Sequence, residues 1–533
     1  MIKIRQVKIP IINDKEEVHI NKITKLLNIS KDKIINYKIN KRSIDARDKK
    51  NILYVYEFIV KCFEEEKILN KISSSDIFLY EERKYQIPPK GNKKLKNRPI
   101  IIGSGPAGLF AAYLLSENGY EPIVLERGEK IEDRVKTVEE FFKTGILDPN
   151  SNIQFGEGGA GTFSDGKLNT LTKDNLRAKK VFEIFVENGA PEEILYDSHP
   201  HIGTDILRKV IKNIRNNIIH NGGTIKYNSL VTNLIIKDNK ITGVIANETE
   251  KYLSDIVVLA IGHSARDTFY MLDSNNIRMK PKNFAIGLRV EHPKEMIDKN
   301  QYGDDYKLLG SASYKLTYQT KSGRGVYSFC MCPGGYVVNA SSEKERICCN
   351  GMSNYERNEK NSNSAIVVTV APKDFGTNLF AGLEFQRTIE TLAYKEGNGL
   401  LPVQLYKDFK NNIKSTSFGD YQPNTKGDYT LANLNNVLPK FITDSIKEAM
   451  PEFGKKIKGF DRDDTIMLGV ETRTSSPIII ERNENYLASI EGIYPCGEGA
   501  GYAGGITTAA IDGIKIAESI ISNYKDRMEN EYE

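Results

Sequence analysis

Three glycines just after residue 100 have the spacing at which a chain can bind the phosphates of a nucleotide. Gly103, Gly105 and Gly108 form a G-x-G-x-x-G turn between a short apolar run and a small-residue stretch of helical periodicity. The first glycine permits the tight bend, the second lets a pyrophosphate approach the backbone, and the third lets the helix pack closely. A second apolar run, 123–125, ends on Glu126, which can accept hydrogen bonds from an adenosine ribose. The pattern predicts a βαβ unit that binds a dinucleotide.

The residues around this turn resemble those of FAD-binding flavoproteins more than those of NAD dehydrogenases. Pro106 and Ala107 lie inside the turn, and the second run continues as Glu126-Arg127-Gly128. The glycine geometry serves either cofactor, so FAD is inferred from the resemblance. The cofactor contacts expected here are Gly103, Ser104, Gly105, Pro106, Ala107, Gly108, Glu126 and Arg127.

Two further stretches have the same glycine spacing, at 156–161 and 499–504. The first follows no clear strand, yet its glycines, with Thr162 and Ser164, can wrap an anion or a flat ring. The second precedes a helix whose positive end would suit the N1–C2=O edge of a reduced flavin. Glu498 stands where many FAD enzymes place an acid that binds the ribityl chain. The additional contacts expected are Gly158, Gly159, Ala160, Gly161, Thr162, Ser164, Gly262, Gly497, Glu498, Gly504, Gly505 and Ile506.

Length and composition restrict the class of protein. A chain of 533 residues should hold two or three domains, and its net charge of +5 is too small to suggest a nucleic-acid binder. Six cysteines do not make a secreted disulfide framework, which favours a reduced cytoplasmic location. The first residues lack the apolar core of a signal peptide, and no transmembrane segment is expected.

The predicted fold is α/β, with a Rossmann-like FAD-binding domain, an inserted α+β cap domain and a small N-terminal domain. We expect a small α/β domain at 1–95, for which a ferredoxin-like arrangement is the hypothesis. The FAD-binding domain is expected at 96–290 and 461–533, and the cap or substrate domain at 291–460. Three strands at 224–227, 229–236 and 241–246 are spaced like a β-meander.

Five segments resemble one bacterial family, the uncharacterised FAD-dependent dehydrogenases with an extra N-terminal domain. That family is similar in plan to glutathione-reductase-type flavoproteins of the geranylgeranyl-reductase kind. The resemblance implies one FAD, held by the first βαβ unit, the 156–164 loop and the C-terminal glycine helix, with the strand around Val231 beside the adenine. It implies no particular substrate. The segments are FGEGGAGTFSDGKL (155–168), HPHIGTD (199–205), SFCMCPGG (328–335), GVETRTSSP (469–477) and GEGAGYAGGITTAAIDG (497–513).

Candidate catalytic residues lie outside these glycine segments. Cys330 and Cys332 either form a redox-active pair or are two small residues of a cap strand; a C-x-C disulfide ring would be small and strained. Arg473 either binds an anion over the flavin or anchors a cap carboxylate. Cys496 offers a site for covalent flavin attachment, although non-covalent FAD is expected. No metal site is expected, because His199 and His201 lack further ligands at suitable spacing.

These observations predict an FAD-dependent oxidoreductase that transfers hydride between the flavin and a small-molecule substrate. NAD(P)H is expected at most as a transient electron donor, since no second Rossmann unit is evident. One alternative is a flavin-binding module that acts on RNA or a protein partner, recruited by basic residues of the N-terminal domain. Another is an NAD-binding enzyme without flavin. The basic residues are Lys41, Arg42, Arg47, Lys49 and Lys50, which a solvated surface or turn also explains.

Overall fold

The N-terminal residues form a four-stranded antiparallel sheet of their own. The computed structural model of the protein describes residues 1–526. The strand order is β2-β3-β1-β4, and every neighbouring pair is antiparallel. With the succession βαββαβ, this order is that of the ferredoxin-like fold, so the hypothesis is confirmed. The elements are β1 (Ile2–Pro10), α1 (Glu16–Leu27), β2 (Ile34–Asp45), β3 (Leu53–Cys62), α2 (Glu65–Leu69) and β4 (Ile77–Leu79).

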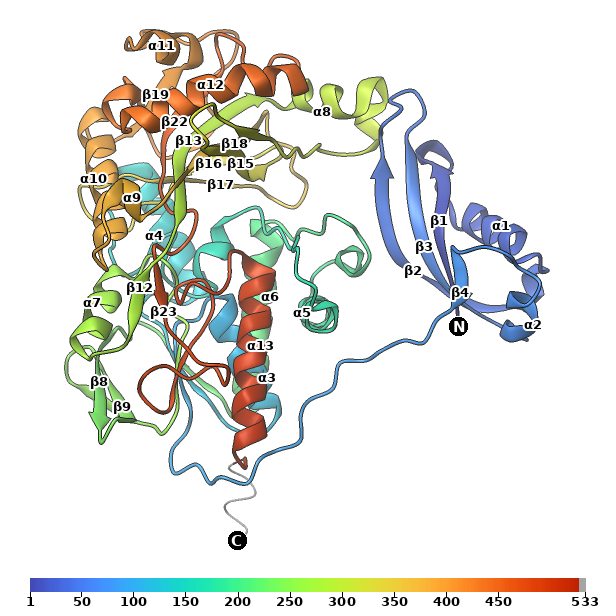
Figure 1. Cartoon of the computed structure of the whole chain (residues 1–533), viewed down its shortest axis with the longest axis horizontal. Helices are drawn as coiled ribbons and strands as arrows, with labels where there is room; N and C mark the ends of the chain where they lie inside the picture. Colours follow the sequence, from blue (N-terminus) through green and yellow to red (C-terminus); the bar gives the residue numbers. More distant parts are fainter. Residues whose placement is uncertain (527–533) are drawn as a thin grey trace.

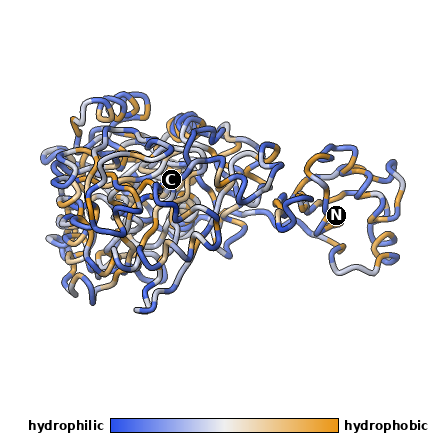
Figure 2. Tube along the Cα trace, turned by 90° about the horizontal axis from the view of Figure 1, so that it is seen from above, coloured by the Kyte–Doolittle hydropathy of each residue, from blue (hydrophilic) through white to orange (hydrophobic). Residues whose placement is uncertain are grey.

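This small domain lies at one end of the molecule, and an extended segment, residues 80–98, leads to the larger body (Figure 1). Seen from above, it is set apart from that body (Figure 2). Near the far end of β2, Arg42 Nη2 donates to Asp197 Oδ2 at 2.9 Å, and the Arg42 N–H donates to the Tyr196 carbonyl at 2.8 Å. Lys49 Nζ donates to the Asn300 carbonyl at 2.7 Å. Two of the five basic residues considered for RNA therefore fasten the domain to the body.

A five-stranded parallel sheet, in the order β24-β11-β5-β6-β7, contains the predicted βαβ unit. The expected meander is displaced by one strand: β7 joins the parallel sheet beside β6, and the antiparallel sheet is β8-β9-β10. The elements are β5 (Ile100–Ile102), α3 (Pro106–Glu117), β6 (Ile123–Leu125), α4 (Ile131–Thr144), α5 (Asn175–Glu187), α6 (Thr204–His220), β7 (Thr224–Lys226), β8 (Val231–Lys237), β9 (Lys240–Ala246), β10 (Glu250–Leu253), β11 (Val257–Leu259), α7 (Arg266–Ser274), β24 (Ile493–Pro495) and α13 (Ile506–Asn523).

A seven-stranded sheet with its own core forms the second half of the body, in the order β14-β15-β18-β13-β22-β19-β21. It includes residues on both sides of the expected 291–460, because β13 begins at 284 and β22 ends at 471. A short ladder of β12 (Met279–Pro281) and β23 (Ile478–Ile480) lies where the chain enters and leaves it. The elements are β13 (Phe284–Pro293), α8 (Lys294–Tyr302), β14 (Thr317–Gln319), β15 (Gly325–Cys332), β16 (Tyr336–Asn339), β17 (Cys349–Met352), β18 (Asn361–Val370), α9 (Pro372–Phe375), α10 (Ala381–Glu396), β19 (Leu401–Leu405), α11 (Tyr406–Asn411), β20 (Thr425–Lys426), β21 (Tyr429–Leu431), α12 (Lys440–Lys456) and β22 (Ile466–Glu471).

Within residues 1–526, none of the helices combines the length and the apolar character needed to cross a bilayer.

Candidate functional site

Loops from distant parts of the chain meet where the strands of the parallel sheet end. This carboxyl edge is where open α/β sheets bind their ligands. A Cβ atom on Gly103, after β5, would lie 2.4 Å from the carbonyl oxygen of Ala260, after β11. A Cβ atom on Gly499, after β24, would lie 2.5 Å from the carbonyl oxygen of Gly262. Glycine at these positions lets the loops pack closely around this edge of the sheet, the crevice in which a ligand would bind.

The first glycine turn has the geometry that the sequence predicts. Gly103 has a φ of +98°, which favours glycine, and a Cβ on Gly108 would lie 2.0 Å from the Gly103 carbonyl oxygen. Gly105 is the N-cap of α3, and no side chain caps the helix; Pro106 and Ala107 follow in its first turn. The N-terminal N–H groups of α3 are therefore available to an anion.

The Glu126 carboxylate organises this turn from the end of β6. It is buried and accepts four hydrogen bonds from backbone and hydroxyl donors, about as many as a carboxylate can accept. Ribose binding would have to share or replace these bonds, so that role of Glu126 stays a prediction. The four donors are Ser104 N–H (2.8 Å), Ser104 Oγ–H (2.7 Å), Gly128 N–H (2.9 Å) and Gly156 N–H (3.0 Å).

Arg127 and the strand that begins at Val231 both lie close to Glu126. Arg127 stacks over Phe155 at 4.1 Å and donates to Asp267 Oδ1 at 3.0 Å, so in this structure it joins the end of β6 to α7. Val231 opens β8, just after Ser229, whose N–H donates to the Glu126 carbonyl at 2.8 Å. The strand expected beside the adenine thus starts close to Glu126.

The 156–164 loop lies against both other glycine segments. A Cβ on Gly159 would lie 3.1 Å from the Gly105 Cα, and one on Gly161 would lie 3.2 Å from Ile506 Cγ1. Gly158 and Gly159 have φ values of +82° and +63°. The Thr162 and Ser164 hydroxyls donate to carbonyls of the loop itself, and Ala160 lies in its short 3₁₀ turn. The three predicted segments are therefore brought together, with backbone rather than hydroxyl groups facing the crevice.

Arg134 of α4 holds this loop in place, a role that sequence reasoning missed. Its side chain is fully buried, and the desolvation lowers the pKa of its guanidinium to about 9. It lies over the Phe163 ring at 4.9 Å. No motif marks an arginine for this task, because its partners are carbonyls, which every residue has. It donates to the carbonyls of Asn152 (2.9 Å), Ile153 (2.9 Å), Glu157 (2.6 Å) and Gly159 (2.9 Å).

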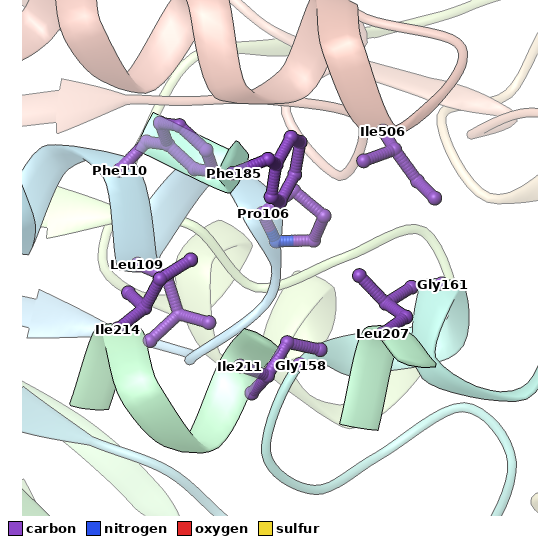
Figure 3. Close-up of a pocket in the computed structure, with 10 residues that line it drawn as sticks. All are labelled: Pro106, Leu109, Phe110, Gly158, Gly161, Phe185, Leu207, Ile211, Ile214 and Ile506. Atoms are coloured by element: carbon purple, nitrogen blue, oxygen red, sulfur yellow. The ribbon is translucent and has the colours of Figure 1, made fainter. Parts of the chain in front are cut away.

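A small apolar pocket lies behind the glycine segments (Figure 3). No charged side chain lines it, so it suits neither a phosphate nor a reacting polar group. It lies between side chains of α3, α5 and α6. The lining residues are Pro106, Leu109, Phe110, Gly158, Gly161, Phe185, Leu207, Ile211, Ile214 and Ile506.

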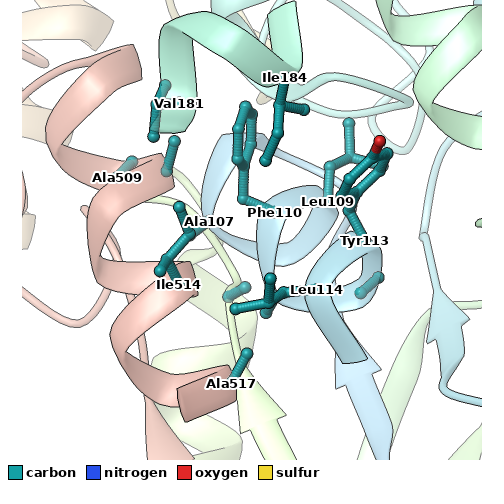
Figure 4. Close-up of a cluster of buried hydrophobic side chains, with 14 of the residues drawn as sticks. Ala107, Leu109, Phe110, Tyr113, Leu114, Val181, Ile184, Ala509, Ile514 and Ala517 are labelled. Carbon is teal, nitrogen blue, oxygen red and sulfur yellow. The ribbon is translucent and has the colours of Figure 1, made fainter. Parts of the chain in front are cut away.

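Helix α13 points its N-terminus at the crevice. Ala509, Ile514 and Ala517 pack it against α3 (Figure 4), and a Cβ on Gly513 would lie 2.2 Å from the Ala107 carbonyl oxygen. At the start of the helix, Gly504 and Gly505 are exposed, and a Cβ on either would meet open space. No side chain caps the helix. The positive end of α13 is thus open to a flat, electron-rich ligand.

Glu498 lies just before this helix. It is half-buried, and desolvation raises the pKa of its carboxyl to about 7, while Lys282 opposes the shift. A carboxyl of this kind can donate or accept a hydrogen bond near neutral pH, which suits the expected ribityl contact. The preceding Gly497 has a φ of +75°, and its N–H donates to Asp512 Oδ2 of α13 at 2.7 Å.

Arg473 anchors a cap carboxylate, one of its two predicted roles. Its Nε and Nη2 each donate to Glu390 of α10 at 2.9 Å. Arg266 of α7 donates to the same carboxylate through Nη1 and Nη2, also at 2.9 Å. Glu390 has no exposed surface. This network joins the two halves of the body.

The cysteine pair is not bonded. All six cysteines are free, and in the C-x-C pair Cys330 is exposed whereas Cys332 is buried. Cys330 lies at a bulge of β15 with a φ of +42°, and its carbonyl accepts hydrogen bonds from Arg289 Nη1 and Nη2 at 3.2 and 3.0 Å. Protein surrounds the site on several sides although solvent reaches the side chain, and this desolvation raises the pKa of the Cys330 thiol. Cys496 is fully buried.

The two histidines of the HPH segment have other partners. His201 Nε2 lies 3.0 Å from the Tyr355 carbonyl oxygen, and the two rings stack. His199 Nδ1 lies 3.0 Å from Asn169 Nδ2. Across residues 1–526, no three His, Cys, Asp or Glu side chains are arranged to hold a metal ion.

Comparisons with known proteins agree with this geometry. Residues 283–474 match the family described as "FAD-dependent protein, C-terminal domain-like", and residues 101–147 match an NAD(P)-binding Rossmann-like domain. Residues 1–61 match a domain of unknown function. An uncharacterised protein of Clostridium beijerinckii (strain ATCC 51743 / NCIMB 8052) is 48% identical over 511 residues, which cover 94% of this chain and 95% of that protein.

Similar solved structures include a triple mutant of the flavin-dependent brominase Bmp2 and the glycine oxidase of Bacillus cereus ATCC 14579. The brominase is 13% identical, with 80% of each chain covered and a TM-score of 0.39. The oxidase is 12% identical, with 82% of this chain and 100% of that chain covered and a TM-score of 0.32. Likenesses of this size carry no inference about the reaction. From the family matches and the relative of nearly equal length, the chain belongs to a family of FAD-dependent oxidoreductases that includes the C. beijerinckii protein.

Proposed function

We propose that the protein is an FAD-dependent dehydrogenase or reductase that acts on a small organic substrate, with the plan of the geranylgeranyl-reductase-like flavoproteins. The observation that carries this proposal is the meeting of three distant glycine segments at one crevice, where Gly159 lies against Gly105 and Gly161 against Ile506. FAD bound there would supply two-electron acceptor and donor chemistry. Its location in the cytoplasm is part of the same proposal and rests on the cysteine usage.

The residues around the crevice fit this cofactor. The uncapped N-terminus of α3 and the backbone of 156–161 suit the pyrophosphate, and the open positions at Gly504 and Gly505 leave room for a planar ring. The positive end of α13 would stabilise negative charge on that ring. Burial of Cys496 argues against covalent attachment of the flavin through that thiol, in keeping with non-covalent binding.

The cap half supplies the substrate side of the crevice. Glu390 fastens α10 to Arg266 and Arg473, which holds the cap close to the parallel sheet and helps to exclude water. Residues 1–526 contain one parallel sheet with a glycine turn, so we propose that NAD(P)H docks only transiently, on the cap side of the crevice. No observation favours recruitment of RNA, since Arg42 and Lys49 are engaged with the body and Arg47 pairs with Asp45.

Absorbance spectroscopy tests the proposal directly. Purified protein should show the flavin bands, or acquire them when FAD is added. Under anaerobic conditions, NADH, NADPH or a member of a metabolite panel should bleach these bands. Protein that has no flavin absorbance even after FAD is added would refute the cofactor assignment, and a flavin that no reductant bleaches would refute the reaction class.

A further inference from the structure

Lys167 lies next to the start of α13 in the structure. The following residue, Leu168, accepts a hydrogen bond at 2.8 Å from Thr507 Oγ1 in the first turn of that helix. On its other side, the backbone of Lys167 forms an isolated antiparallel β-bridge with that of His201. The backbone at Lys167 is thus held next to the first turn of α13, whose N-terminus the proposed function assigns to the flavin ring.

The charged end of Lys167 lacks a hydrogen bond. Its Nζ is shielded from solvent and makes none with any side chain or backbone group of residues 1–526. Its ion-pair partner is Asp165, whose Oδ2 lies 3.4 Å away. The same carboxylate is already held by Arg357, which donates from Nε at 2.9 Å and from Nη2. Burial lowers the pKa of His201, so this neighbour is neutral at pH 7. Lys167 and Arg357 therefore share the Asp165 carboxylate. This leaves a net positive charge in the group and leaves the N–H donors of Lys167 Nζ without hydrogen bonds.

The segment that carries Cys330 packs against the segment that carries Lys167. The backbone of Lys167 pairs with that of His201. The Thr204 N–H donates to the Ser353 carbonyl at 3.0 Å, and the Ser353 hydroxyl donates to the Pro333 carbonyl at 3.1 Å. In keeping with this, burial raises the pKa of the Cys330 thiol, and the positive charge of Lys167 opposes this larger effect.

Cys330 is the exposed member of the six cysteines. A non-glycine residue in the left-handed region is sterically unfavourable and persists only where its surroundings hold it. Arg289, fully buried, holds it by binding the Cys330 carbonyl. The strand is therefore built to turn this side chain out of the sheet.

We propose that Lys167 binds an oxyanion of the substrate, a carboxylate or a polarised carbonyl oxygen, in a site bordered by Cys330. The inference rests on the proposed function for the position of the flavin beside the site. A buried, unfilled ammonium donor favours an oxygen ligand with negative charge, since a charge-assisted hydrogen bond is about twice as strong as a neutral one. The substrate class is accordingly a small organic acid or carbonyl compound.

Alkylation of Cys330 tests this inference independently of turnover. Iodoacetate carries a carboxylate, whereas iodoacetamide is its neutral counterpart of similar shape. In both cases the thiol gives its proton to solvent, the sulfur bonds to the CH₂ carbon, and iodide leaves. The FAD-loaded protein is treated with each reagent, the modified cysteine is located by mass spectrometry, and the iodoacetate-to-iodoacetamide rate ratio is compared with that for glutathione. We expect the ratio at Cys330 to be about tenfold higher than for glutathione, the value of one charge-assisted hydrogen bond.

Matched variants identify the origin of the preference. Lys167→Gln should bring the ratio close to that of glutathione, and Lys167→Arg should retain much of it. Lys173→Gln, which removes an exposed charge nearby in the sequence, should leave it unchanged. Unreactive propionate should slow iodoacetate labelling in the unmodified protein. A ratio equal to that of glutathione, an unlabelled Cys330, or a preference that survives Lys167→Gln would overturn the inference. Flavin absorbance of the same samples tests the proposed function separately, so the two failures are distinguishable.

Discussion

Replacing Glu390 with glutamine should destabilise the protein far more than losing an exposed ion pair on the same helix. Glu390 has no exposed surface and accepts hydrogen bonds from Arg266, Arg473 and the Thr472 hydroxyl. Glutamine keeps the shape of the side chain but removes the charge and turns an N–H group towards the guanidinium groups. The variant therefore leaves buried positive charge without its partner.

The expected cost follows from burial and from the remaining partners. Removing one member of a buried ion pair costs about 3–5 kcal/mol. Because Glu343 still pairs with Arg266, we expect the lower end, about 3 kcal/mol. The control is Glu384→Gln, also on α10, which breaks an exposed pair with Arg387 at 2.8 Å. Such pairs contribute about 1 kcal/mol or less.

The pH dependence gives a second, independent check. Burial alone would raise the pKa of Glu390, but the guanidinium groups of Arg266 and Arg473 hold it well below the ordinary value of 4.5. A carboxylate with a depressed folded-state pKa stabilises the protein above its unfolded pKa, and this contribution is lost as the pH falls towards the folded value. The difference between the unmodified protein and Glu390→Gln should therefore be constant from neutral pH to about 5 and shrink below it.

Urea unfolding followed by far-ultraviolet circular dichroism measures both quantities, and the chain has no tryptophan for a fluorescence assay. If Glu390→Gln and Glu384→Gln shift the transition equally, the network does not join the two halves as described. A difference that stays constant down to acid pH would equally contradict the charge argument.

Three further perturbations test other parts of the molecule. Gly159→Ala adds a Cβ to a residue with φ +63° beside the Gly105 segment, so the Kd for FAD, measured by equilibrium ultrafiltration, should rise about tenfold or more; an unchanged Kd would contradict the close approach. Glu498 has its pKa raised to about 7, so the folded protein retains a proton that the unfolded chain releases above 4.5, and stability should fall as the pH rises between these values. Glu498→Gln should remove this slope in the Tm, and an unchanged slope would assign it to other groups. Arg42→Ala should speed proteolysis within 80–98, whereas Arg47→Ala, which breaks a pair inside the N-terminal domain, should not; equal rates would argue against docking through Arg42.

Local backbone requirements explain why the cofactor half of the crevice could be predicted from the sequence. A turn that needs a positive φ or a close approach of two backbones favours glycine. The positions of Gly103 and Gly108 in the sequence therefore predict the conformation of the turn. Strand pairing is different, because the residues of a strand do not specify which other strand lies beside it. Residues 224–227 looked like the first strand of a meander, yet β7 pairs with β6, about a hundred residues earlier in the chain.

The substrate half depends on which charges remain unbalanced after folding, and this cannot be deduced from residue types. From the sequence, Arg473 was equally suited to bind a flavin and to bind a cap carboxylate. In the fold, Glu390 pairs with Arg473, so this guanidinium is not available to a ligand. Lys167 carried no signal at all, being one basic residue in a polar glycine segment. It becomes distinctive only because Arg357, nearly two hundred residues later, binds Asp165, the carboxylate with which Lys167 is paired. A cofactor site formed by backbone groups can therefore be predicted from the spacing of glycines. A site formed by an unpaired charge cannot, because it depends on which distant side chains pair with each other in the folded protein.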